Sequence, residues 1–213
     1  NLLAEFCEFH GINHAFLPPS LLSVLDPEKF NGIKQILTGG ESISRTTFNN
    51  WKYGRKIYNL YGPTECTVLA SFKIMNDDEP INNIGKPIEN MDFHIYTEEG
   101  LLSNKGELYI SGVGLSEGYL KRAKDTGSQF HNKVVDNTSI FLYKTGDLVE
   151  RMENGDLLFL GRVDRQIKLR GYRIELEEIE YALMELGYQE VALTVKNDSL
   201  VAYVVALDKP CIN

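Results

Sequence analysis

The sequence predicts an α/β protein made of three successive parts. Up to residue 83, segments with helical spacing of apolar residues alternate with short apolar strands, which is typical of a parallel sheet covered by helices. From residue 84 to residue 163, short strands alternate apolar and polar residues, which predicts an antiparallel, barrel-like or sandwich-like unit. A third unit, residues 164–213, combines short strands with one helix and is expected to be a small α+β subdomain.

The elements of the first part follow from apolar spacing and turn residues. They are, in order, a helix at 2–9, a strand at 12–17, a helical turn at 20–25, a strand at 33–37, a helix at 42–51 and a strand at 56–60. Ser42 or Ser44 could cap the second of these helices. Ligands commonly bind at the carboxyl ends of parallel strands, so the residues after the strand at 56–60 are candidates for a site.

The later elements are shorter. Expected strands of the second part are 91–96, 107–111, 140–143, 149–151 and 157–160, and an Asn154-Gly155 turn joins the last two as a hairpin. Beyond Asp164 the apolar alternation changes phase at Gly171, which predicts a bulge or bend there. A helix from Leu176 to Leu186, ended by Gly187, and two strands at 191–195 and 200–206 complete the chain.

The charge of the chain argues against a nucleic-acid partner. Its 213 residues include 22 Lys and Arg against 30 Asp and Glu, a formal net charge of −8, so the basic surface typical of nucleic-acid binders is missing. The sequence has neither a bilayer-spanning apolar run nor a signal peptide at its start, so we expect a cytoplasmic protein with no membrane partner. Cys7, Cys66 and Cys211 are far apart and odd in number, which favours reduced thiols, and we interpret Cys66 as a packed residue and not a nucleophile.

Two turns after predicted strands carry polar side chains. In TGGE (38–41), paired glycines would let the backbone pass close to a flat or bulky ligand, although a plain strand-to-helix turn explains them equally well. In NLYGPTE (59–65), Pro63 fixes the backbone so that Thr64 and Glu65 point the same way. A hydroxyl beside a carboxylate is what a phosphate with a hard cation requires. The alternative is that Thr64 caps a helix with Glu65 in its first turn.

Two later stretches are also richer in polar residues than their strands need. In YKTGDL (143–148), Asp147 follows a glycine at a strand end, where a carboxylate could accept both hydroxyls of a ribose. The stretch GRVDRQIKLRGYRIELEEIE (161–180) concentrates the basic residues Arg162, Arg165, Lys168, Arg170 and Arg173. Such a concentration suits a phosphate-bearing partner, and the alternative is a solvated strand face.

Together with GELYISGVGLSEGYL (106–120), these stretches in this order and spacing resemble the adenylate-forming superfamily, specifically the amino-acid adenylation domains of nonribosomal peptide synthetases. The resemblance runs from about residue 15 to the last strand. It implies the C-terminal part of a large domain, with a parallel α/β layer and an antiparallel barrel-like unit, followed by part of a small C-terminal subdomain.

The resemblance also implies a reaction. An amino acid would attack ATP with Mg²⁺ to give an aminoacyl-adenylate, and would then pass to the phosphopantetheine thiol of a peptidyl carrier protein. In the family pattern Tyr61 stacks on adenine, Asn59 reads the adenine edge, Thr64 meets the phosphates and Glu65 holds Mg²⁺. The other implied nucleotide contacts are Gly39, Gly40, Glu41, Gly62, Asp147 at the ribose hydroxyls, Phe159 and Arg162.

Substrate choice and domain motion are implied in the same way. The side-chain pocket of the amino acid would be lined by Phe16, Leu37, Gly39, Leu60, Val68 and Leu69. These residues are apolar or small, so an aliphatic substrate such as Leu, Ile or Val is expected. Asp164 matches the hinge of the small subdomain, and Gly171 matches the loop that faces the pantetheine tunnel.

Some family features are missing from the sequence. The Gly-rich Ser/Thr phosphate loop, the pocket aspartate that binds the amino group and the C-terminal catalytic lysine do not occur in it. We therefore expect a stretch of a longer protein that is inactive alone. Two alternatives remain open: an acyl-CoA or free-standing acid ligase of the same superfamily, and an inactive nucleotide-binding or carrier-docking module.

Overall fold

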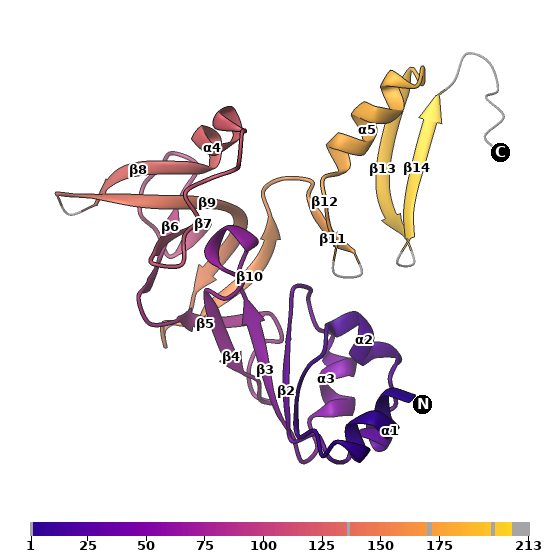
Figure 1. Cartoon of the computed structure of the whole chain (residues 1–213). Helices are drawn as coiled ribbons and strands as arrows, with labels where there is room; N and C mark the ends of the chain where they lie inside the picture. Colours follow the sequence, from indigo (N-terminus) through magenta and orange to yellow (C-terminus); the bar gives the residue numbers. More distant parts are fainter. Residues whose placement is uncertain (1, 136, 170–171, 197–198, 206–213) are drawn as a thin grey trace. The chain divides into compact units, whose positions relative to one another are not determined.

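A computed structural model describes residues 2–135, 137–169, 172–196 and 199–205 (Figure 1). The chain divides into two compact units, residues 1–163 and residues 164–213. The larger unit contains one mixed sheet of ten strands, and the smaller unit contains two two-stranded sheets and a helix. The prediction of an α/β protein is confirmed.

The larger unit begins with the parallel layer. Its elements are α1 (Leu2–Phe9), β1 (His14–Phe16), α2 (Pro19–Val24), the 3-10 turn η1 (Pro27–Phe30), β2 (Gln35–Gly39), α3 (Arg45–Trp51) and β3 (Lys56–Tyr61). Strands β1, β2 and β3 are parallel neighbours, as the alternation of helix and strand predicts. Figure 1 shows α1, α2 and α3 gathered on one side of these strands.

The helices of this layer pack around Trp51. Its side chain is fully buried, and its indole Nε1 donates to the carbonyl of Leu22 at 2.9 Å. Ser44 is the cap of α3, because its hydroxyl accepts from the backbone N of Thr47 at 3.0 Å. Helix α1 forms where the apolar spacing predicts it. Nevertheless, its larger apolar side chains are exposed, and the residues that it buries are Ala4 and Cys7.

The rest of the larger unit is antiparallel. It contains η2 (Thr64–Cys66), β4 (Ser71–Ile74), β5 (Asn83–Pro87), β6 (Met91–Tyr96), β7 (Lys105–Gly112), α4 (Ala123–Gln129), β8 (Phe130–Val135), β9 (Thr138–Arg151) and β10 (Leu157–Arg162). The strand order is β1-β2-β3-β4-β5-β10-β9-β7-β6, with β8 paired to β9. The described strands therefore form an open sheet that continues the parallel layer and do not close into a barrel.

The hairpin predicted at Asn154-Gly155 is confirmed, because Arg151 of β9 pairs with Leu157 of β10. Strands β4, β5 and β8 and helix α4 were not predicted. Strand β5 contains Gly85 and Pro87, which normally weaken a strand, but its neighbours β4 and β10 hold it in the sheet. Helix α4 buries no residue, so it leaves no apolar stripe in the sequence.

The smaller unit contains β11 (Ile167–Leu169), β12 (Tyr172–Ile174), α5 (Leu176–Glu185), β13 (Glu190–Lys196) and β14 (Ser199–Val205). Strands β11 and β12 pair antiparallel with Leu169 opposite Tyr172, so the chain reverses between them where a bulge or bend was predicted. Gly171 itself lies outside the described residues.

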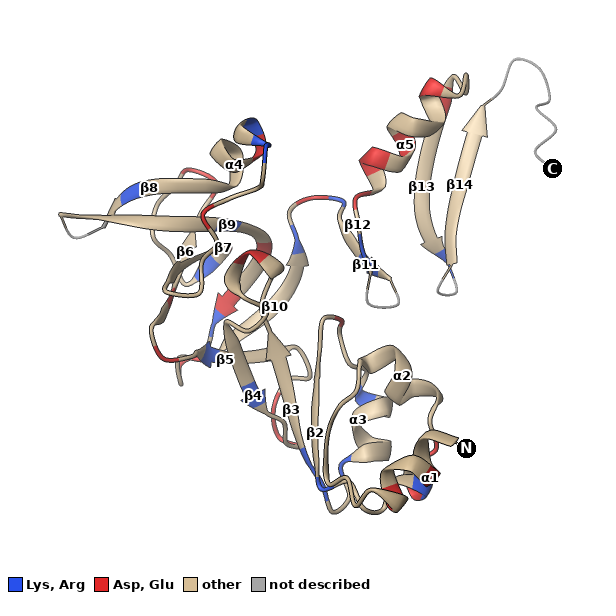
Figure 2. Cartoon of the chain, viewed as in Figure 1, with Lys and Arg blue, Asp and Glu red and all other residues tan. Residues whose placement is uncertain are grey.

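Helix α5 is amphipathic as predicted, and Figure 2 shows acidic residues along it. One of them, Glu180, is buried and accepts both guanidinium nitrogens of Arg165, at 2.7 and 2.8 Å, and the backbone N of Leu193 at 2.7 Å. This bidentate pair ties the first residues of the unit to its helix and to β13. No helix in the described ranges is long and apolar enough to cross a membrane.

Candidate functional site

The NLYGPTE stretch forms the end of β3 and the tight loop that follows it. After Tyr61 the chain turns into η2, and the backbone N of Ala70 returns to the carbonyl of Tyr61 at 2.8 Å. Gly62 is required here, because a Cβ would lie 2.5 Å from the carbonyl O of Val68. Thr67 and Val68 have left-handed backbones, with φ of 55° and 72°. The loop therefore holds an unfavourable conformation that its surroundings must stabilise.

Residues 114–119 provide part of that support. Thr67 Oγ1 donates to the carbonyl of Gly114 at 2.7 Å, and the backbone N of Ser116 donates to the carbonyl of Glu65 at 2.8 Å. The Glu65 carboxylate is buried and accepts from the Tyr119 hydroxyl at 2.6 Å. The GELYISGVGLSEGYL stretch thus orients the carboxylate predicted to hold Mg²⁺. The adjacent Thr64 is exposed.

A second cluster joins β3, β9 and β10, and Asp147 lies within β9 and not at a strand end as predicted. The Tyr61 hydroxyl donates to Asp147 Oδ2 at 2.5 Å, and Arg162 Nη1 donates to Asp147 Oδ1 at 2.6 Å. Thr145 orients this carboxylate, since its hydroxyl accepts from the backbone N of Asp147 at 2.9 Å and donates to the carbonyl of Leu108 at 2.7 Å. Tyr61 from β3, Asp147 from β9 and Arg162 from β10 are therefore in direct contact.

The electrostatics of this cluster fix the protonation of Tyr61. Burial, and then the negative charge of Asp147, raise the pKa of the Tyr61 phenol well above its usual value. Tyr61 therefore stays a neutral donor to Asp147 over the physiological range. A carboxylate has about four acceptor positions. Tyr61 and Arg162 each occupy one of them, on different oxygens of the Asp147 carboxylate.

Asn59 and Phe159 are linked through Asn83, the first residue of β5, and Asn82, which precedes it. The Asn59 side chain is buried, and its Nδ2 donates to the carbonyl of Asn83 at 2.8 Å. The backbone N of Phe159 donates to the carbonyl of Asn82 at 3.0 Å, and Asn82 Nδ2 donates to the carbonyl of Phe159 at 2.7 Å. Asn83 thus contacts the Asn59 side chain, and the adjacent Asn82 contacts the backbone of Phe159.

The predicted pocket residues fall into two groups. Phe16 pairs with Leu37 on β1 and β2, and Gly39 pairs with Leu60 on β2 and β3, so these four lie close together on the parallel layer. Gly39 has no space for a side chain, because a Cβ would lie 2.4 Å from the carbonyl O of Leu60. Of the remaining pair, in the loop after η2, Val68 is exposed and Leu69 is half-buried.

The other predicted site residues lie apart from these clusters. Gly40 is exposed in the turn after β2, and Glu41 Oε2 accepts from the backbone N of Ser20 at 3.1 Å. Asp164 opens the smaller unit, where its Oδ1 accepts from the backbone N of Gln166 at 3.1 Å. Gly171, the predicted thiolation-loop residue, lies outside the described residues.

The buried thiol beside the loop has no nucleophilic character. Cys66 is fully buried, and burial together with the charge of Glu65 raises its thiol pKa to about 12. Only the thiolate is reactive, so at neutral pH Cys66 is a packing residue.

The residues fit ATP and a magnesium ion that arrives with it. The described ranges contain no group of three or more His, Cys, Asp and Glu that could hold a metal alone. Mg²⁺ is usually bound by one or two protein carboxylates plus substrate phosphates, so the single carboxylate of Glu65 suits this mode. The cluster at Asp147 brings this carboxylate together with Tyr61 and Arg162. Sequence reasoning did not single out Tyr119, Thr145 and Asn83, although the first two lie inside quoted motifs.

Comparison with known proteins identifies the family. The family model described as AMP-binding enzyme matches residues 1–120, more than half of the chain. The chain belongs to the AMP-binding enzyme family.

Relatives of this AMP-binding enzyme include large synthetases. Nonribosomal peptide synthetase 5 of Aspergillus fumigatus is 36% identical over 87% of the chain, and tyrocidine synthase 2 of Brevibacillus parabrevis is 36% identical over 95%. The chain spans only 9% and 6% of these two relatives.

Solved structures match most of the chain. An NRPS protein containing adenylation and PCP domains has a TM-score of 0.84 and 28% identity, covering 95% of this chain and 44% of that one. The adenylation domain AlmE of Vibrio cholerae, in complex with glycyl-adenosine-5′-phosphate, has a TM-score of 0.81 and 27% identity, covering 95% of this chain and 42% of that one.

Proposed function

We propose that the full-length protein activates an amino acid with ATP and transfers it to a carrier protein in nonribosomal peptide synthesis. The observation that carries the proposal is the cluster of Tyr61 at the end of β3, Asp147 within β9 and Arg162 at the end of β10. It lies in a member of the AMP-binding enzyme family whose relatives include peptide synthetases. The fold alone would not select a substrate.

The proposed chemistry has two steps. In the first, a carboxylate oxygen of the amino acid bonds to the α-phosphorus of ATP while the bond to the pyrophosphate oxygen breaks. The products are an aminoacyl-adenylate and pyrophosphate. In the second, the phosphopantetheine sulfur of the carrier bonds to the acyl carbon, and AMP leaves. Both steps depend mainly on positioning the reactants and neutralising negative charge.

The residues of this chain hold the nucleotide in this proposal. Asp147, fixed by Tyr61 and Arg162, accepts the ribose hydroxyls, and Asn59 and Tyr61 contact the adenine. Thr64 is exposed in the loop and meets the phosphates, while Glu65 is held by Tyr119 so that its carboxylate can bind Mg²⁺. The bound Mg²⁺ would neutralise charge on the phosphates.

The amino-acid substrate is aliphatic in this proposal. Phe16, Leu37 and Leu60 lie together on the parallel layer beside Gly39, which leaves an apolar surface without a buried charge. A charged substrate side chain would lose its hydration on such a surface without gaining a partner. Leu, Ile and Val are therefore the favoured substrates. Discrimination among them is expected to be weak, because Val differs from Leu and Ile by one methylene group and Leu differs from Ile only in its branching.

The smaller unit is proposed to move during the reaction. Asp164, the first residue of that unit, is proposed as the hinge, and Gly171 is proposed to face the carrier. Because the chain spans less than half of the solved relatives, residues 1–213 alone are proposed to be inactive.

The test is amino-acid-dependent exchange of pyrophosphate into ATP by the full-length protein. The panel contains Leu, Ile, Val, charged amino acids, and fatty and aryl acids, and Glu65→Ala is the inactive control. Exchange driven by the aliphatic amino acids and lost in Glu65→Ala is the expected result. Exchange driven only by fatty or aryl acids would assign the protein to the acid ligases. Absence of exchange with every acid of the panel would favour an inactive nucleotide-binding or carrier-docking module.

A further inference from the structure

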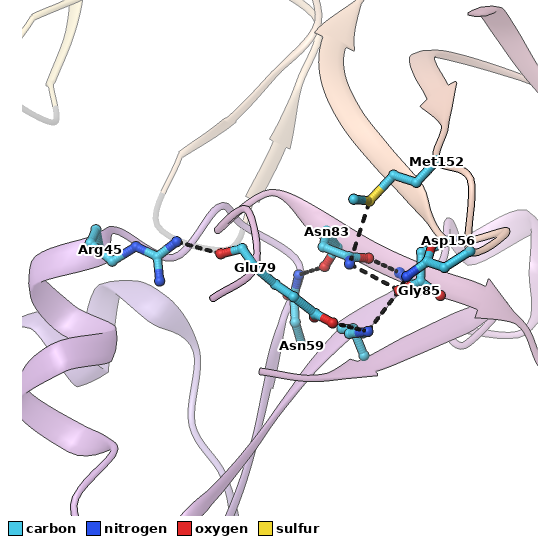
Figure 3. A network of polar contacts seen from close by, with 9 residues as sticks. Arg45, Asn59, Glu79, Asn83, Gly85, Met152 and Asp156 are labelled. Carbon is cyan, nitrogen blue, oxygen red and sulfur yellow. Dashed lines mark hydrogen bonds and ion pairs between the residues drawn. The ribbon is translucent and has the colours of Figure 1, made fainter. Parts of the chain in front are cut away.

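A polar network is joined to Asn59 through Asn83 (Figure 3). On the β3–β4 ladder Asn59 is paired with Lys73, so the two side chains share one face of the sheet. Lys73 Nζ donates to Asp156 Oδ2 at 2.7 Å and to Glu79 Oε1 at 2.8 Å. Asp156 lies in the β9–β10 hairpin, far from Lys73 in the sequence. The network therefore joins three separate segments of the larger unit next to a predicted base-contacting residue.

Asn83 connects this network to Asn59. Its Nδ2 donates to Asp156 Oδ2 at 3.0 Å, and its Oδ1 accepts from the backbone N of Gly85 at 2.8 Å. Both ends of the Asn83 side chain are therefore held. The backbone carbonyl oxygen of Asn83 accepts a hydrogen bond from Asn59 Nδ2 at 2.8 Å. Asn59 and Asn83 are both buried. Hydrogen bonds at both ends of the Asn83 side chain therefore hold the residue whose backbone carbonyl faces Asn59.

Asp156 is the ionised centre of the network. Its side chain is buried, and burial alone would raise its pKa, but the hydrogen bonds from Lys73 and Asn83 lower the pKa overall. Asn154 Nδ2 donates to the same oxygen at 3.1 Å. A carboxylate that accepts three donors inside a protein holds each of them in a defined direction.

We propose that Asn83 is a positioning residue that fixes the orientation of the Asn59 amide and so selects adenine over bases that carry a carbonyl at the same position. This inference rests on the proposed nucleotide site. If the Asn59 side-chain amide rotated by half a turn, its Oδ1 would take the place of Nδ2 opposite the backbone carbonyl of Asn83. Two acceptor oxygens would then face each other. The observed orientation leaves Oδ1 to accept from the exocyclic amine of adenine. Hypoxanthine has a carbonyl there and would oppose Oδ1.

The experiment measures binding of ATP and of inosine triphosphate to the full-length protein by calorimetry, without an amino acid. The wild type is expected to bind ATP roughly tenfold or more tightly than inosine triphosphate, the value of one well-placed hydrogen bond. Asn83→Ala is expected to weaken ATP binding and to reduce this preference to about two- to threefold. In pyrophosphate exchange it should raise KM for ATP and leave kcat within about twofold.

Ser71→Ala is the matched control. Its hydroxyl donates to the carbonyl of Ile84 at 2.7 Å, so it also removes one buried hydrogen bond to β5, at the residue next to Asn83. It should leave the base preference unchanged. The double variant Asn83→Asp/Asp156→Asn places the acceptor at position 83 and the donor at position 156. It should recover at least half of the preference for ATP over inosine triphosphate that Asn83→Asp alone loses.

The outcomes separate this inference from the proposed function. Equal binding of both nucleotides by the wild type would overturn it, as would an unchanged preference in a folded Asn83→Ala protein. If Asn83→Ala does not fold, the double variant Asn83→Asp/Asp156→Asn decides. Its failure to restore the preference for ATP over inosine triphosphate would overturn the inference. Base-selective nucleotide binding without pyrophosphate exchange would support the role of Asn83 and contradict the proposed amino-acid activation.

Discussion

The hydrogen bond between Tyr61 and Asp147 gives a prediction that can be worked from the structure. Tyr61→Phe removes only the hydroxyl, which donates to a buried carboxylate at 2.5 Å, and leaves Arg162 in place. A hydrogen bond to a charged group contributes about 1.5 to 3 kcal/mol, and its loss leaves one acceptor position of Asp147 unfilled. For a chain of this size, each kcal/mol lowers Tm by about 2 to 4 °C, so a decrease of about 3 to 12 °C is expected.

The assay is thermal unfolding of the 213-residue chain, followed by circular dichroism at neutral pH. Tyr58→Phe is the matched control, since it removes the same atom from a half-buried tyrosine on β3 whose ring contacts Phe72. The control should unfold within about 1 °C of the wild type, as expected of a substitution that removes no buried hydrogen bond. If the two variants unfold at the same temperature, the contact between Tyr61 and Asp147 does not stabilise the protein.

Four further predictions concern the stability of the fold. The pKa of Asp156 is lower in the folded protein than in the unfolded chain, so its carboxylate stabilises the fold at pH values above the unfolded pKa. This contribution is lost as the pH falls through the folded pKa. Asp156→Asn should therefore reduce the loss of stability at acid pH when the free energy of urea unfolding is measured against pH. Burial alone would lower the pKa of Lys73, but its pKa is raised overall. The contribution of Lys73 to the free energy of unfolding should therefore be lost only at high pH, and Lys73→Met should reduce the loss of stability at alkaline pH in the same assay. Gly62→Ala should destabilise the chain by about 1 to 3 kcal/mol in the same assay, because the added Cβ meets backbone atoms, and an unchanged midpoint would show that the loop can move aside. Glu180→Gln should accelerate hydrogen exchange in α5 and β13 without affecting β3, since its bidentate partner Arg165 lies within the smaller unit; uniform acceleration would contradict that separation.

Local signals in the sequence predicted the elements whose structure depends on nearby residues. The helix capped by Ser44 and the hairpin at Asn154-Gly155 both follow from side chains within a few positions of each other. The exposed face of α1 could not be predicted, because which residues a helix buries depends on the neighbours that cover it. Strand β5 was missed for a similar reason, since its partner β10 comes from a distant part of the chain.

The site divides in the same way. Asp147 and Glu65 lie in short motifs with a characteristic residue order, so the sequence identified them as candidates. Asn83 and Asp156 gave no signal, because they are 73 positions apart and become partners only when β5 pairs with β10. A single buried Asn or Asp carries no information about its partner until the strands are placed.

The central claim is that a substrate carboxylate attacks the α-phosphorus of ATP. The most direct measurement uses the full-length protein, Mg²⁺, ATP and leucine whose carboxylate is labelled with ¹⁸O, with hydroxylamine present to release the acyl group. The account predicts that AMP forms in step with pyrophosphate, and that it carries one labelled oxygen taken from the carboxylate. Unlabelled AMP, or release of ADP in its place, would contradict the account.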